Sequence, residues 1–143
     1  MNWKFWNKRK ESKTIPQNRP PGKINPTDNV LAETRDPCLR CGACCAFFLV
    51  SFPSQETQSA GGSVPFKLTG KSVKNRRYMK GTETKHPRCT ALDGFIGARV
   101  SCRIYNDRPS ICKAFSRSWK NDASNFLCDR ARAAYGLQTF SQY

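Results

Sequence analysis

Hydrophobic residues in this chain form short runs separated by long polar stretches, a pattern that predicts short elements rather than long helices. The densest apolar run is AFFLVSF at residues 46–52, whose aromatic and branched side chains predict a buried strand. Residues 89–92 and 98–105 alternate enough to predict two extended segments. Asp93-Gly94 and Gly97 lie between them and favour a hairpin.

The remaining pattern predicts one more strand, a loop and two helices. Residues 76–79 suit a short strand, and the Ser- and Gly-rich stretch 53–65 suits an ordered loop or a short helical turn. Asn106 or Asp107 would cap a helix ending near Phe115, and a last helix would run over 124–135 before Gly136. The expected fold class is therefore α+β: a small metal-organised domain with short strands (a hairpin around 89–105), two short C-terminal helices and long ordered loops.

The chain divides into an arm, a domain and a tail. Residues 1–36 are basic and Pro-rich and predict a disordered N-terminal arm, whose Trp3, Phe5 and Trp6 could meet a membrane or nucleic acid but are better explained as a solvated tail. Residues 37–137 would form the cysteine-cluster domain, and 138–143 a C-terminal tail. No apolar run approaches the roughly 20 residues that span a bilayer, and no secretory signal is visible, so we expect a cytoplasmic location.

The amino-acid composition indicates that thiol chemistry is central to this protein. The chain has 8 cysteines in 143 residues and a formal net charge of +15. In a reducing cytoplasm, dense cysteines indicate metal binding or catalysis more than disulfides. The basic stretch 67–88 suits a phosphate-bearing or acidic partner, such as nucleic acid or an acidic redox protein, and would equally offset the charge of anionic thiolates.

The early cysteines form one compact motif, Cys38-x-x-Cys41-x-x-Cys44-Cys45. A two-residue spacer lets two thiolates converge on one ion, and Gly42 permits the turn that this requires. The motif lacks the Cys-Pro that completes a ferredoxin pattern. Because the adjacent thiols of Cys44 and Cys45 cannot easily hold one ion together, they indicate two sites or a polynuclear one.

The late cysteines bring the number of candidate ligands to eight. Each late cysteine taken singly could be a small buried hydrophobe, and Cys128 on the last helix most of all. Eight thiols fit two Cys-only sites, or one four-iron cluster with another site. His86, the one histidine, is expected to be exposed rather than a ligand. The predicted metal ligands are Cys38, Cys41, Cys44, Cys45, Cys89, Cys102, Cys112 and Cys128.

Several blocks accompany these cysteines: CLRCGACC at 38–45, RCTALDGFIGARVSCRIY at 88–105 and DRPSICKAF at 107–115. Together they resemble the YkgJ-type cysteine-cluster proteins over residues 37–137. The resemblance implies a zinc- or iron-chelating domain, described for some members as ferredoxin-like or iron–sulfur, and carries over all eight cysteines as ligands. It also includes Arg108, which we interpret as a helix-start or cluster-facing cation.

Three functions from different classes follow. The first is a metal-binding protein holding zinc, iron or an iron–sulfur cluster, with electron transfer or metal handling as its role. The second is a thiol–disulfide redox enzyme using a CxxC dithiol, although no thioredoxin-like βαβ pattern accompanies it. The third is a zinc-stabilised nucleic-acid-binding module, for which no groove-entering motif is visible. No other catalytic constellation is present, so an enzyme is the less favoured class.

Overall fold

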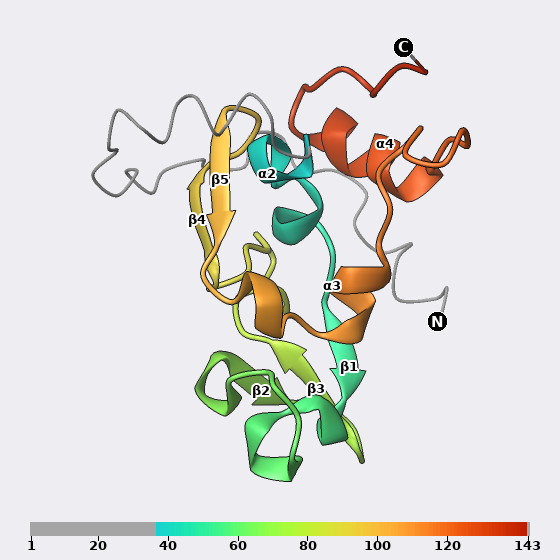
Figure 1. The fold of residues 1–143 in the computed structure, drawn as a ribbon. Helices are drawn as coiled ribbons and strands as arrows, with labels where there is room; N and C mark the ends of the chain where they lie inside the picture. The colour runs from blue at the N-terminus through green and yellow to red at the C-terminus, as the bar shows by residue number, and fades with distance from the viewer. Residues whose placement is uncertain (1–36, 143) are drawn as a thin grey trace, which may run out of the picture.

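The computed structural model describes residues 37–142, and the predicted N-terminal arm lies outside them. The described chain is a small α+β domain with short antiparallel strands, as the pattern predicted (Figure 1). Its helices are α2 (Cys38–Cys41), α3 (Ser110–Ala114) and α4 (Phe126–Ala134). Its strands are β1 (Ser51–Pro53), β2 (Thr69–Lys71), β3 (Arg76–Met79), β4 (Leu92–Phe95) and β5 (Arg99–Cys102).

The strands form two separate antiparallel sheets at different ends of the molecule. Strand β3 lies between β1 and β2 in a three-stranded sheet, with Tyr78 opposite both Ser51 and Gly70. Strands β4 and β5 form a hairpin in which Leu92 faces Cys102. Figure 1 shows α2 beside the hairpin, with α3 between the three-stranded sheet and α4. Of the late cysteines, Cys102 ends strand β5 of the hairpin, and Cys112 and Cys128 lie on α3 and α4.

The predicted strand at 46–52 is mostly wrong. Strand pairing covers only Ser51–Pro53, and Cys44–Ala46 instead forms a 3-10 turn. The amides of Phe47 and Phe48 bond back to the carbonyl of Cys44, so no cross-strand partner is available to them. Apolar character predicted burial correctly, since Ala46, Phe48 and Phe52 are all in the core. A short apolar run does not by itself distinguish a strand from a tight helical turn.

The hairpin is confirmed, but its turn is shifted. Asp93 and Gly94, expected in the link, lie inside β4 opposite Ser101 and Val100. Gly94 adopts φ +99, and an added Cβ would lie 2.2 Å from the carbonyl oxygen of Arg99. The glycine is thus required by close strand approach rather than by the turn.

The first C-terminal helix begins later than expected. Residues Tyr105–Asp107 form a separate 3-10 turn, and α3 starts at Ser110 after Pro109. Neither Asn106 nor Asp107 caps it. Instead Glu56 accepts from the Ser110 backbone amide at 2.7 Å and from its hydroxyl at 2.5 Å. A carboxylate 54 positions away supplies the cap, which local sequence could not reveal.

The last helix follows its prediction more closely. Asn125 caps α4 by accepting a hydrogen bond from the Leu127 amide at 3.0 Å. After the end of the helix, Gly136 adopts the left-handed conformation at φ +67. The Tyr135 hydroxyl donates to the carbonyl of Ala46 at 2.6 Å. This bond ties the end of α4 to the turn that carries Cys44 and Cys45. Within residues 37–142, no helix is long and apolar enough to cross a membrane.

Candidate metal centre

The early cysteines lie on a tight knuckle formed by α2 and the 3-10 turn after it. Gly42 ends α2 in the left-handed region, at φ 66, and its amide bonds to the carbonyl of Cys38. A Cβ at Gly42 would lie 2.8 Å from a Val100 methyl, so only glycine lets the knuckle pack on β5. The Gly97 amide donates to the Cys41 carbonyl at 2.8 Å, which also holds the knuckle against the β4–β5 hairpin.

Three late cysteines reach this knuckle from three different segments. The Cys89 amide donates to the Cys45 carbonyl at 2.9 Å, which joins the two cysteine-bearing segments directly. Cys102 ends β5, and Cys112 lies in the middle of α3. The fold thus brings together thiols more than 60 positions apart in the sequence, such as Cys45 and Cys112.

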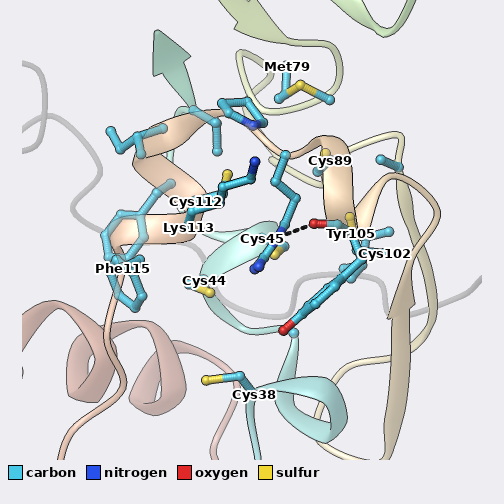
Figure 2. A pocket seen from close by; sticks show the side chains of 18 of the residues that line it. Cys38, Cys44, Cys45, Met79, Cys89, Cys102, Tyr105, Cys112, Lys113 and Phe115 are labelled. Carbon is cyan, nitrogen blue, oxygen red and sulfur yellow. Dashed lines mark hydrogen bonds between the residues drawn. The ribbon is translucent and has the colours of Figure 1, made fainter. Parts of the chain in front are cut away.

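These thiols surround one cavity of about 200 Å³. Figure 2 shows Cys45, Cys89, Cys102 and Cys112 around its middle, with Cys44 between that group and Cys38. No Asp, Glu or His of the described residues lines it. Apolar side chains such as Met79 and Phe115 make up most of the remaining wall, together with the cations Arg108, Lys113, Arg117 and Lys120. The cavity is therefore a sulfur-rich pocket without oxygen or imidazole donors from acidic or histidine side chains.

Cys41 and Cys128 lie outside this cavity lining. Both are buried, Cys41 at the end of α2 and Cys128 in the first turns of α4. The guanidinium of Arg132 donates from Nη1 to the Cys41 sulfur at 3.0 Å. The same guanidinium carbon lies 3.9 Å from the centre of the Phe140 ring, and its Nε donates to the Gln138 carbonyl at 2.6 Å.

The pocket thiols perturb one another electrostatically. Burial, reinforced by the charges of Cys89, Cys44 and Cys102, raises the pKa of Cys112 to about 12. A hydrogen bond between the two adjacent thiols lowers the pKa of Cys44 and, together with burial, raises that of Cys45 well above its usual value. Burial likewise raises the pKa of the Cys89 thiol. Without metal, most of these groups are held as neutral thiols.

Arg108 is one of the cations that line the pocket, as the sequence suggested. Its guanidinium lies 3.8 Å from the Tyr105 ring centre, and its Nε donates to the Tyr105 carbonyl at 2.7 Å. Burial raises the pKa of Cys102, and the Arg108 charge opposes that rise. The guanidinium is thus placed to stabilise negative charge on the thiols.

His86 is exposed, as expected. Arg132 was missed by sequence reasoning, although its position one helical turn after Cys128 was an available signal.

In residues 37–142 no three Cys, His, Asp or Glu side chains already stand in a metal-holding arrangement. The donor chemistry nevertheless fits zinc or iron, which soft thiolates prefer, and binding would draw the gathered thiols together.

The fold and the site together define the class of protein. It is a small α+β domain in which six of the eight cysteines line one sulfur-rich pocket. The chain belongs to the family described as "Putative zinc- or iron-chelating domain", which matches residues 37–129. It is 49% identical over 102 residues to "Uncharacterized protein YkgJ" of Escherichia coli O157:H7, covering 71% of this chain and 94% of that protein. It is 39% identical over 104 residues to "Putative ferredoxin" of Acinetobacter calcoaceticus, covering 73% and 78% respectively. No solved structure matches the chain significantly.

Proposed function

We propose that this protein binds zinc or iron through its cysteine thiolates. One observation carries the proposal: six of the eight cysteines line a single cavity whose described lining contains no acidic or histidine side chain. Magnesium and calcium need oxygen ligands, whereas zinc and iron–sulfur clusters accept four thiolates. No disulfide joins any of the eight cysteines, all of which lie within residues 37–142, so each can serve as a thiolate ligand.

We infer that the metal also stabilises the fold. A thiol must lose its proton to become a ligand, and buried neutral thiols contribute only weak packing. A bound cation compensates the thiolate charge, and its binding free energy then adds to folding free energy. A domain with strands of three or four residues gains most from such stabilisation.

Iron would add electron transfer to this role, and a basic surface would supply its docking site. The ferredoxin-like relative supports the iron form. Exposed cations along β2 and β3 could attract an acidic redox partner; they are Lys67, Lys71, Lys74, Arg76 and Lys80. We place the protein in the cytoplasm, where a reducing environment keeps the thiols available.

Anaerobic purification followed by elemental analysis and absorbance spectroscopy tests this function. Stoichiometric iron with broad charge-transfer absorbance at about 400 nm would identify an iron–thiolate centre. Stoichiometric zinc in a colourless protein would identify a structural or metal-handling site and remove electron transfer. A metal-free chain that stays folded and cycles a Cys38–Cys41 dithiol would contradict the proposal and favour a thiol redox enzyme.

A further inference from the structure

The adjacent residues Cys44 and Cys45 mark a boundary between two groups of thiols. They occupy successive positions of a 3-10 turn, where neighbouring side chains leave the backbone about 120° apart. In Figure 2, Cys45 lies toward Cys89 and Cys102, while Cys44 lies on the side toward Cys38. Although a hydrogen bond joins the two thiols, each lies toward a different group of cysteines and can serve a different centre.

The first group gathers around Cys45. The Cys89 backbone is hydrogen-bonded to the Cys45 backbone, and Cys102 and Cys112 complete the ring of sulfurs in the middle of the cavity. Cys45 interacts electrostatically with Cys112 and Cys89, and Cys112 with Cys89 and Cys102; Cys44, at the boundary, also acts on both Cys45 and Cys112. These four residues come from four separate segments of the chain.

The second group gathers where α2 meets α4. Cys38 and Cys41 are three residues apart on α2, so their side chains are neighbours on one face. Cys128 and Arg132 are four residues apart and share a face of α4, and Arg132 contacts the Cys41 sulfur. The charges of Cys41 and Cys44 both act on the Cys128 thiol.

We propose that the eight cysteines form two distinct four-thiolate centres that share the CxxCxxCC knuckle. The first would use Cys45, Cys89, Cys102 and Cys112, and the second Cys38, Cys41, Cys44 and Cys128. This inference rests on the proposed function and deepens it by assigning each ligand to a centre. Four thiolates complete a tetrahedral site or anchor a four-iron cluster, so neither centre needs a further ligand.

An arginine lies near each centre, and the charge of Arg108 also acts on Cys44 of the second centre. Four thiolates around a divalent metal carry a charge of about −2, which a nearby guanidinium offsets. Arg108 faces the thiols of the first centre, and Arg132 is hydrogen-bonded to Cys41 in the second. Hydrogen bonds to ligand sulfurs change the metal affinity and the reduction potential of a site. Because the two arginines interact with the thiols differently, the two centres should differ in metal affinity and, with iron, in reduction potential.

Matched double variants of the full chain test the partition, with Co²⁺ as a spectroscopic probe. C89S/C112S removes two thiols from the first centre, C41S/C128S removes two from the second, and C89S/C128S removes one from each. Reduced protein is titrated anaerobically with Co²⁺, and chelator-resistant metal showing a four-thiolate spectrum is counted. Far-UV circular dichroism confirms folding, and either same-centre variant suffices for the comparison with C89S/C128S.

We expect about two such Co²⁺ ions per wild-type chain, about one in each same-centre variant and none in the cross-centre variant. Equal loss in same-centre and cross-centre variants would overturn the partition. Loss of all metal from every variant would also overturn it, in favour of one polynuclear centre. A wild-type chain that binds no Co²⁺ would instead refute the proposed function itself.

Discussion

Arg132 donates a hydrogen bond to the sulfur of Cys41 at 3.0 Å, across 91 positions of sequence. The contact joins the last helix to the cysteine knuckle that begins the domain. The guanidinium is held on its other sides by the Phe140 ring and the Gln138 carbonyl. These three contacts hold the Arg132 side chain in one position. Its hydrogen bond to the thiol is therefore a defined feature of the fold.

Substituting this arginine should weaken metal binding without unfolding the chain. Partners that hydrogen-bond to metal ligands typically change affinity about 10–100-fold when removed, so we expect R132Q to lose that much for Zn²⁺. R130Q is the matched control, because it removes the same charge from the same helix. Competition with a chromophoric chelator measures both. Equal losses in R132Q and R130Q would indicate an effect of net charge alone.

Arg108 should affect the pocket thiols through its charge. Its guanidinium opposes the raised pKa of Cys102 and Cys112, which burial chiefly causes. R108Q should therefore raise the pKa of these thiols further, while R108K should restore part of the effect because it keeps the charge. Thiolate absorbance followed against pH in metal-free protein gives the comparison. An unchanged titration in R108Q would show that the guanidinium does not act on them.

Several elements of this fold could be predicted from local sequence, and the exceptions have physical causes. The strand at Arg76–Met79 and the helix capped by Asn125 both form where the local pattern indicates. The start of α3 depends on Glu56, and the position of Gly94 depends on the facing strand. Distant partners of this kind leave no local signal.

The candidate site also combines features that local sequence predicts with features that depend on distant partners. The motif itself predicted the thiols as ligands and indicated that Cys44 and Cys45 belong either to two sites or to a polynuclear one. Which late cysteine joins which early one depends on how α3, α4 and the hairpin pack, and spacing along the chain contains no such information. The spacing of Arg132 from Cys128 was visible in the sequence, but its contact with Cys41 exists only after α4 docks on the knuckle.

The core should be sensitive to loss of Phe52, which has no exposed surface. F52A would leave a cavity in the core and lower the free energy of unfolding by about 3–5 kcal/mol. F126A is the control, since Phe126 is 65% exposed and its removal should change stability by less than about 0.5 kcal/mol. Denaturant unfolding of metal-loaded protein measures both. Similar values for the two variants would contradict this assignment of the core.

Stability should depend on pH in opposite directions with and without metal. Burial raises the pKa of Cys112 to about 12 in the folded chain, whereas an unfolded thiol titrates at about 8.5. The native state therefore favours the neutral thiol, and its contribution to stability is complete below about pH 8.5 and is lost as pH rises toward 12. With metal bound, thiolates replace thiols, so lowering the pH should destabilise the complex.

Unfolding of metal-free protein at about pH 7.5 and 9.5 tests this sign. Wild type should lose stability at the higher pH, and C112A should lose less, because it lacks one of the thiols that resist ionisation. Lysine titration is common to both proteins and cancels in the comparison. A wild type that gained stability on alkalinisation would contradict the neutral-thiol account of the pocket.

X-ray absorption at the metal edge of the anaerobically purified protein tests the central claim most directly, because it reports the atoms bound to the metal. Ligation by the cysteines predicts an inner shell of sulfur alone, at about 2.3 Å from the metal. A shell of nitrogen or oxygen at about 2.0–2.2 Å would instead indicate binding by histidine, carboxylate or water. That result would contradict a cysteine metal centre.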